Sequence, residues 1–360
     1  NTRKPAITNL RSLNIIRQSK LKILDLDDYY ENNNRIENQI KLIKNNLRKI
    51  FLNVDYFEKI FSIETFSFWN SIKNSFQNIC EARFLESTKR ILLLENLFRS
   101  HDIENILVWV DVGQEEKECI LVGKKSKILS IMLQHGRFQT SEIWNKFAPF
   151  LGQFPAPLLS DKQIVWGETT KQYAIKHNHS SENLIVAGSP RHDKFFNFSE
   201  KSTENGIIVL ATTGTMSLSA DSCTTSSQIK YDKFIQEIYR IVKLLPNQKL
   251  VVKPHPGKII NKYVRDLINE IDPSIAIIEN ISNEKLFSSA DLLITFNNST
   301  TALESLIVGT PAISLQTEPW ANEDDIAQSG TIACISEISE CESTIKKILY
   351  DKNFKKTLSV

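Results

Sequence analysis

Two features of the sequence carry residue types that suit chemistry on a phosphate group. His255 follows a short apolar run, and residues 297–301 form a polar loop directly before an apolar, helix-like stretch at 302–308. Such a loop offers free backbone N–H groups at a helix start, together with hydroxyl and amide side chains, and these groups bind anions. We therefore expect a phosphate-binding site that includes His255, Asn298, Ser299 and Thr300.

Three apolar runs must position these groups. Residues 249–254, 291–296 and 311–316 have the length and composition of strands, and helical stretches separate them. Consecutive β-α-β units pack as a parallel sheet with right-handed crossovers. In such sheets ligands bind beyond the carboxyl ends of the strands, where the polar residues of this segment lie.

Two further side chains belong to this candidate site. Lys253 stands at the same strand end as His255, and Glu304, one turn inside the helix, could reach ribose hydroxyls. A simpler interpretation is that Ser299 or Thr300 only caps a helix and that His255 only ends a strand. The two features together, on neighbouring strand ends, favour a nucleotide site.

These motifs resemble a known family. The steps 253–256 (Lys-Pro-His-Pro), 297–304 and 309–311 (Gly-Thr-Pro) are similar to the donor-binding domain of GT-B glycosyltransferases that carry an HP motif and a serine/threonine motif. The relatives that they resemble are CDP-glycerol glycerophosphotransferases, bacterial sialyl- and polysialyltransferases and capsule Kdo transferases. The resemblance implies a nucleotide-activated donor, with CMP or CDP favoured, and no metal and no separate cofactor. Asn297-Asn298 stands where many of these relatives have serine or Asp-Tyr.

A second alternating block lies earlier in the chain. Residues 106–112 and 128–133 are expected strands; the first runs to Asp111, and Gln134-His135-Gly136 follows the second. An imidazole beside a glycine at a strand end suits proton transfer near neutral pH. The His-Gly step also resembles the family above, in which it faces the donor site, so that His135 or Asp111 is the candidate general base.

The chain between these blocks adds further candidates. Residues 183–188 are an expected strand that runs into Arg191-His192-Asp193, a step that resembles the passage between domains in the glycerophosphotransferases. Arg191 could grip a phosphate or form a buried ion pair with Asp193. Residues 206–211 begin the second domain and end in a small polar loop able to approach phosphates. The loop residues concerned are Thr213, Gly214 and Thr215.

The N-terminal third has a different pattern. Residues 21–26 are a plausible strand that runs into the acidic and aromatic stretch 27–30. The triplet Asp25-Leu26-Asp27 at its end is an acidic motif that some transferases use to hold a metal, although three residues recur by chance. Residues 31–100 contain no proline or glycine and show apolar residues at helical spacing, which predicts a helical insert. Its aromatic side chains could line an acceptor groove, but we expect them to form core.

Composition sets broad limits on the class of protein. The 360 residues are 41% hydrophobic and 24% charged, with a net charge of +2, which favours neither nucleic acid nor an anionic membrane as a partner. Five cysteines without CxxC spacing indicate a reducing cytoplasm and no structural zinc. No apolar run approaches ~18 residues and no signal peptide is present, so we expect a chain that neither spans a membrane nor is exported alone. The start at Asn1 rather than Met suggests a fragment.

We therefore expect an α/β protein of two Rossmann-like domains that face a cleft, the GT-B fold. Residues 1–190, with the helical region 31–100, would form the acceptor-side domain, and residues 191–360 the nucleotide-donor domain. The expected function is that of a cytoplasmic glycosyltransferase or glycerophosphotransferase, peripheral at the inner face of the membrane, that acts on a glycan or lipid-linked acceptor. A UDP-N-acetylglucosamine 2-epimerase-like enzyme is a second interpretation, although its expected arginine-rich first loop and Ser-Gly-Gly loop are not visible. A catalytically silent partner protein is a third.

Overall fold

The computed structural model describes residues 10–20, 22–31, 34–111, 113–138, 140–143, 145–146, 159–198, 205–213 and 225–358. The chain divides into two compact units, Asn1–Met132 with Leu159–Lys162, and Leu133–Leu158 with Gln163–Val360. The expected domain boundary at residue 190 stays a prediction. Among the described helices, none combines the length and the apolar character needed to cross a membrane.

The first unit begins with helices and ends in parallel strands. Its elements are α1 (Leu10–Ser19), η1 (Leu26–Tyr29), α2 (Arg35–Phe51), α3 (Val54–Ile60), β1 (Ser62–Ile63), β2 (Phe66–Ser67), α4 (Trp69–Ser100), β3 (Asn105–Val108), α5 (Gln114–Lys125) and β4 (Leu129–Leu133). β3 and β4 pair in parallel, as the sequence predicts. The expected strand at 106–112 ends at Val108, so that Asp111 lies in the connection that leads to α5.

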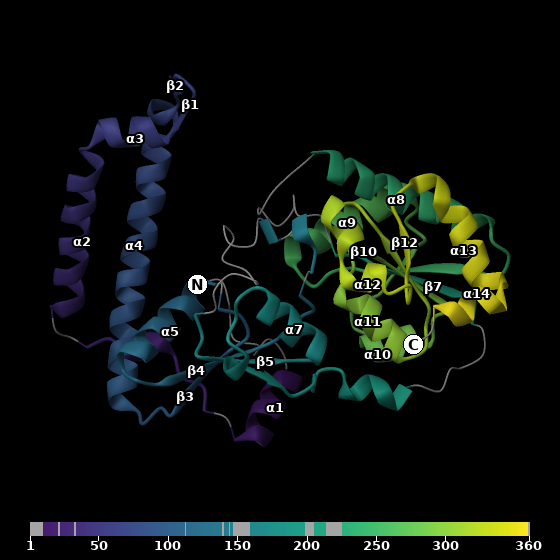
Figure 1. Ribbon diagram of the computed structural model, residues 1–360, viewed down its shortest axis with the longest axis horizontal. Helices are drawn as coiled ribbons and strands as arrows, with labels where there is room; N and C mark the ends of the chain where they lie inside the picture. The colour runs from purple at the N-terminus through teal and green to yellow at the C-terminus, as the bar shows by residue number, and fades with distance from the viewer. Residues whose placement is uncertain are drawn as a thin grey trace. The chain divides into compact units, whose positions relative to one another are not determined.

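The helical insert is confirmed and consists of a pair of long helices. α2 and α4 pack side by side, and α3 with the short antiparallel hairpin β1–β2 lies at one end of the pair (Figure 1). Inside this end Phe57 and Phe61 stack on Trp69, with ring centroids 4.6 and 5.4 Å apart. These aromatic side chains are therefore mainly core, as expected, and Phe66 is an exception at 70% exposed.

The expected strand at 21–26 was wrong. Residues 22–25 have no regular structure, and η1 follows them. The Asp25 carboxylate accepts a hydrogen bond of 3.0 Å from the backbone N–H of Asp27 and so caps η1. The acidic end of the run thus favours a turn, because an aspartate that bonds its neighbouring backbone competes with extended structure.

The second unit contains the remaining elements. They are β5 (Lys162–Val165), α7 (Glu168–Lys176), η2 (Ser181–Asn183), β6 (Leu184–Val186), η3 (Asp193–Phe198), β7 (Ile207–Ala211), α8 (Thr225–Leu244), β8 (Lys249–Lys253), α9 (Lys258–Ile271), β9 (Ala276–Ile277), α10 (Asn283–Ser288), β10 (Leu292–Phe296), α11 (Thr300–Ile307), β11 (Ala312–Leu315), η5 (Pro319–Glu323), α12 (Asp325–Gln328), β12 (Ala333–Ile335), η6 (Ile338–Glu340), α13 (Cys341–Tyr350) and α14 (Lys352–Thr357). β5 and β6 pair in parallel. The strands expected at 249–254, 291–296 and 311–316 are confirmed as β8, β10 and β11.

A six-stranded sheet organises this unit. Its order is β12-β11-β10-β7-β8-β9, and every pair in it is parallel. Counted along the chain, this is the doubly wound order of a Rossmann-like domain, in which the winding direction reverses between β7 and β10. All five residues of β10 are buried, as a central parallel strand requires.

Apolar side chains from both faces of this sheet build two cores. Ile208 and Leu210 of β7 belong to a core shared with α8, α9 and α13, whereas Val209 and Ala211 belong to one shared with α10 and α11. Successive strand residues point to opposite faces, so the alternation follows from strand geometry. The helices surround the sheet in Figure 1. The expected α/β class with parallel, Rossmann-like sheets is confirmed.

Candidate functional site

The loops after β7, β8 and β10 emerge at one edge of the six-stranded sheet. Ala211 at the end of β7 pairs with Lys253 at the end of β8. On the other side of β7, the Thr295 hydroxyl donates to the Ala211 carbonyl over 3.2 Å. This edge includes the β7–β10 reversal, where two neighbouring loops turn away from each other and ligands of doubly wound sheets bind.

His255 lies at this edge in a defined orientation. Its backbone N–H donates to the hydroxyl of buried Thr212 over 3.3 Å. The backbone N–H of Gly257 donates to its Nδ1 over 3.0 Å. Because Nδ1 accepts, the proton of the neutral ring belongs on Nε2, which becomes a hydrogen-bond donor. Burial lowers the pKa of His255 and so favours this neutral form.

The ammonium of Lys253 is occupied by the protein itself. It donates to the backbone carbonyls of Glu279 and Ile281 over 2.6 and 2.8 Å. Burial lowers the pKa of Lys253, and the nearby Glu279 charge opposes that shift. In this structure Lys253 therefore anchors the loop after β9, and its role toward a phosphate stays a prediction.

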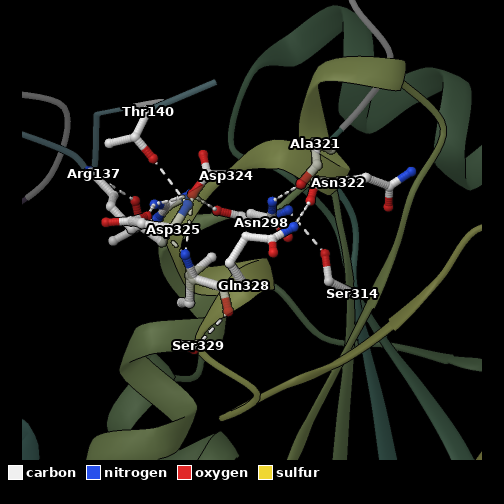
Figure 2. A network of polar contacts seen from close by, with 12 residues as sticks. Arg137, Thr140, Asn298, Ser314, Ala321, Asn322, Asp324, Asp325, Gln328 and Ser329 are labelled. Carbon is white, nitrogen blue, oxygen red and sulfur yellow. Dashed lines mark hydrogen bonds and ion pairs between the residues drawn. The ribbon is translucent and has the colours of Figure 1, made fainter. Parts of the chain in front are cut away.

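Asn297 and Asn298 form the turn that connects β10 to α11. Both have positive φ, +46° and +56°, in the left-handed region that asparagine tolerates better than most residues. Asn298 is 1% exposed, and its amide nitrogen donates to the Ala321 carbonyl over 2.6 Å (Figure 2). Its amide oxygen accepts from Gln316 over 2.9 Å. The Asn298 side chain thus fastens the turn to the following chain, and both of its polar groups have protein partners.

Ser299 and Thr300 begin α11 in different ways. Ser299 is the N-cap residue, and its hydroxyl accepts from the backbone N–H of Thr301 over 3.4 Å. This is the capping role of the simpler interpretation. The Thr300 hydroxyl accepts from the backbone N–H of Arg137 over 3.4 Å, and a Cβ placed on Gly136 would lie 3.8 Å from the same oxygen. The His-Gly step therefore lies against the start of α11, and both belong to the second unit.

Gln134 holds the turn that carries His135. Its amide donates to the Gly136 carbonyl over 3.0 Å and accepts from the Trp166 backbone N–H over 2.7 Å. The Trp166 indole in turn donates to the Gln134 carbonyl over 2.8 Å. The His135 side chain is exposed, whereas the backbone carbonyls of its two neighbours, Gln134 and Gly136, accept hydrogen bonds.

Arg191 connects this turn to Glu304. One guanidinium nitrogen donates to the His135 backbone carbonyl over 3.0 Å, and the other pairs with Glu304 over 2.8 Å. Glu304 is 1% exposed and also accepts from the Asn283 amide over 2.7 Å. Its carboxylate is thus held by two partners. Arg191 pairs with Glu304 and not with Asp193, so the expected partner in the ion-pair interpretation was wrong.

His192 is a neighbour that the sequence did not single out as a functional group. It is buried, and its Nδ1 lies 2.7 Å from the Ser189 hydroxyl. Its Nε2 lies 3.9 Å from Glu304 and has no hydrogen-bond partner among the described residues. Burial lowers the pKa of His192, which favours a neutral ring beside Glu304.

A buried ion pair beside the turn at Asn298 was also missed by the sequence analysis. Arg137 contacts the carboxylates of Asp324 and Asp325 and the backbone carbonyl of Asn298, as Figure 2 shows. Asp324 is fully buried, and desolvation raises its pKa to about 6 despite the opposing effect of Arg137. No local pattern marks this pair, because its members are 187 positions apart and meet only in the folded chain.

The remaining predicted site residues lie in two other segments of the chain, at Asp111 and at 213–215. Asp111 belongs to the first unit, is buried, and accepts from the backbone N–H groups of Leu159 and Ser160 over 2.9 and 3.3 Å. Thr213 is half-buried just beyond β7. Gly214 and Thr215 lie outside the described residues.

The acidic motif at 25–27 shows local contacts. Asp25 caps η1, and Asp27 pairs with Lys89 over 2.8 Å. Within the part of the chain that the structure describes, no group of three or more His, Cys, Asp or Glu side chains is arranged to hold a metal ion. The expected metal-free mechanism stays a prediction.

Comparisons with known proteins agree with this architecture. The model of the family described as LIC12162 family transferase matches residues 6–328. The UDP-GlcNAc 2-epimerase from Neisseria meningitidis bound to UDP-GlcNAc is 15% identical, with a TM-score of 0.53 over 76% of this chain and 76% of that chain. The S. aureus MnaA–UDP structure is 14% identical, with a TM-score of 0.53 over 76% of this chain and 73% of that chain. At such identities the likeness shows the fold alone, which is of the GT-B type. The comparison with curated proteins gave no match.

Proposed function

Because the chain belongs to the LIC12162 family of transferases, we propose that it transfers a sugar or polyol phosphate from a nucleotide-activated donor to a hydroxyl acceptor. The observation that carries this proposal is the edge of the six-stranded sheet at the β7–β10 reversal. His255, in its neutral form, follows the carboxyl end of β8, and α11 begins just after the carboxyl end of β10. Both therefore lie at the same edge of the sheet. A neutral imidazole N–H donates to phosphate oxygens, and the positive end of a helix dipole attracts them. The backbone N–H groups of residues 298, 299, 301 and 302 have partners within the protein, so the start of α11 would act mainly through its dipole.

The donor that we propose is a pyrimidine nucleotide. The HP and serine/threonine motifs resemble those of cytidine-nucleotide users, and this favours CMP or CDP. The two similar structures were solved with UDP-GlcNAc and with UDP, which are also pyrimidine nucleotides. A thermal-shift comparison of CMP, CDP, UDP, GDP and TDP tests this point, because a ligand that binds the folded state raises Tm. We expect CMP or CDP to stabilise most; stabilisation by GDP alone would refute a pyrimidine donor.

The transfer step would proceed by displacement at the donor. The acceptor hydroxyl loses its proton to His135 and forms a bond to the electrophilic carbon or phosphorus, while the bond to the leaving phosphate oxygen breaks and its electrons stay on that oxygen. His255 Nε2–H and the first turn of α11 would stabilise the negative charge that develops there. The Thr300 hydroxyl accepts from the backbone N–H of Arg137, the residue after the His-Gly step, and so connects the start of α11 to the segment that carries His135.

The base assignment can be tested separately from the donor site. His135 is exposed, so His135→Ala should leave Tm and nucleotide affinity nearly unchanged while kcat falls by ~10²–10⁴-fold. Asp111 is the alternative base. Its carboxylate receives two backbone N–H groups, so Asp111→Asn should lower Tm whether or not it lowers kcat. Near-normal turnover in His135→Ala would transfer the base role to Asp111.

An epimerase is the second candidate function. The chain has the same fold as the two similar structures, and one of them is a UDP-GlcNAc 2-epimerase. Epimerisation at C2 breaks a C–H bond and needs no acceptor, whereas transfer consumes one. Incubation with UDP-GlcNAc alone in D2O, followed by proton NMR, separates the two. Deuterium at C2 without an acceptor would favour the epimerase.

A further inference from the structure

Arg191 forms a bridge between the backbone of the proposed base and the helix of the proposed donor site. Its side chain is 51% exposed, yet two of its guanidinium nitrogens have acceptors within the protein. One donates to the His135 backbone carbonyl over 3.0 Å, and the other pairs with Glu304 of α11 over 2.8 Å. Arginine suits such a bridge because its N–H donors project in fixed directions from one rigid plane.

Glu304 anchors one end of the bridge. Its carboxylate is 1% exposed, and the oxygen that Arg191 leaves free accepts from the Asn283 amide over 2.7 Å. A buried carboxylate is costly unless it is paired and hydrogen-bonded, so the contact with Arg191 is strongly favoured. Ala302 of the same helix is fully buried in the core below the sheet edge. The core of the second unit therefore fixes where this end of the bridge lies.

The other end of the bridge acts on the turn that carries His135. The hydrogen bonds of Gln134 stabilise this turn without reaching α11. Two further contacts join the turn to that helix. One is the bond of 3.4 Å from the Arg137 backbone N–H to the Thr300 hydroxyl, and the other is the Arg191 bond. The Arg191 bond is shorter, has a charged donor and acts on the residue that bears the imidazole.

We propose that Arg191 is a positioning residue for the transfer reaction. Through the His135 carbonyl it holds the backbone of the general base at a fixed distance from the start of α11, where the leaving phosphate binds. This inference rests on the proposed function, in which His135 takes the acceptor proton. A base must lie within hydrogen-bond reach of that proton, and a displacement of about 1 Å can lower the rate ~10²-fold. Arg191 itself touches no reacting atom in this mechanism.

The variant Arg191→Lys separates the two contacts of the bridge. A lysine ammonium is a single charge centre, so it can keep the ion pair with Glu304 but cannot reach both acceptors in the same way. We expect a Tm close to that of the wild type, unchanged affinity for CDP and UDP, and a kcat at least ~10-fold lower. The assay is nucleotide release from a panel of CMP-, CDP- and UDP-activated sugars and polyols, with glycerol as the acceptor.

Lys194 offers a matched control. It pairs with Glu284 over 2.9 Å, and the two side chains are 54% and 12% exposed, so this is also a half-exposed cation on a largely buried carboxylate of the second unit. Neither residue has a printed bond to the turn of His135 in the part of the chain that the structure describes. Lys194→Ala should therefore leave kcat within ~2-fold of the wild type, even where the loss of the ion pair lowers Tm.

A double-mutant cycle with His135→Ala shows whether Arg191 acts through the base. If it does, Arg191→Lys should lower kcat little further once residue 135 is alanine, whereas independent effects would multiply. Amide hydrogen exchange of residues 134–137 gives a readout without turnover. We expect exchange there to be faster in Arg191→Lys and unchanged in Lys194→Ala.

The outcomes distinguish this inference from the proposed function. A wild-type kcat in Arg191→Lys, multiplicative effects in the cycle, or unchanged exchange at 134–137 would overturn the positioning role while the transferase assignment stands. Weaker CDP and UDP binding with an unchanged kcat would also overturn it, because Arg191 would then be a donor contact. A wild-type protein that releases nucleotide from no member of the panel would refute the proposed function, and the positioning role with it.

Discussion

The backbone N–H of Gly257 donates to Nδ1 of His255 over 3.0 Å. This single contact determines which ring nitrogen carries the proton, and it therefore decides what the histidine can offer to a ligand. In a protonated ring the N–H at Nδ1 would face the N–H of Gly257, so that two donors would oppose each other. Burial lowers the pKa of His255, so the neutral, Nε2-protonated form predominates at neutral pH.

Replacement of His255 can separate the acceptor role of Nδ1 toward Gly257 from the donor role of Nε2 toward a ligand. In His255→Asn the side-chain oxygen can still accept from Gly257, but the outer N–H donor is lost. We expect nucleotide affinity to fall by about 10–100-fold, which corresponds to a hydrogen bond to a charged group, with little change in Tm. His255→Ala should show the same loss of affinity and also a lower Tm. Unchanged nucleotide titrations for both variants would remove His255 from the donor site.

The Arg191–Glu304 pair should be a stability determinant. Arg191→Ala leaves the Asn283 amide as the one hydrogen-bond partner of the buried Glu304 carboxylate among the described residues, and we expect a loss of about 2 kcal/mol in the free energy of unfolding. Adding Glu304→Gln to that variant should recover part of the loss, since the unpaired charge is then gone. Asp193→Ala is the control and should stay within about 0.5 kcal/mol of the wild type. Equal effects of Arg191→Ala and Asp193→Ala in urea denaturation would contradict this account.

Asn298 should matter through the fold of its turn. Asn298→Ala removes the bonds to Gln316 and Ala321 and puts a residue that tolerates φ +56° less well than asparagine at this position, so we expect a loss of about 2–4 kcal/mol in the free energy of unfolding. Asn298→Gly removes the same bonds without the conformational penalty and should be about 1 kcal/mol less destabilising. A variant with wild-type stability that no longer binds nucleotide would instead place the Asn298 amide on the ligand.

Asp324 should make stability depend on pH in the acidic range. Its pKa rises from an ordinary 3.8 to about 6 on folding, mainly because it is buried. Between these values the folded state binds a proton that the unfolded state has released, so this stabilising contribution is complete below about pH 4 and is lost as pH rises through 6. Asp324→Asn should remove a decline of about 1–3 kcal/mol over that window, measured as the free energy of unfolding against pH. Parallel curves for the two proteins would show that Asp324 does not titrate there.

Transfer should proceed without a divalent metal. The proposed phosphate contacts are His255 and the start of α11, and Asp25 and Asp27 are engaged in a helix cap and in an ion pair with Lys89. We expect turnover to persist after EDTA treatment, with no gain from added magnesium or manganese. Activity that EDTA abolishes and manganese restores would return the two aspartates to consideration.

The sequence by itself determined the secondary structure around the site. The apolar run of β10 is uninterrupted because a central parallel strand is buried on both faces, and this composition can be read directly. Ser299 as a helix cap and His255 beyond a strand end follow from equally local rules. A parallel, Rossmann-like sheet was expected from the alternation of strands and helices, and the structure supplies its strand order.

Only the tertiary structure decided what each polar side chain does. Arg191 and Glu304 are 113 positions apart in the sequence, and Arg137 and Asp324 are 187 apart. No local sequence pattern predicts either contact. The Asn298 amide is turned inward because Gln316 and the Ala321 carbonyl lie within its reach once β10 and β11 pair. Local composition restricts backbone shape, but hydrogen-bond partners depend on which distant segments the sheet order brings together. For that reason the elements were predictable, and the assignment of Lys253, Asn298 and Arg191 to particular partners was not.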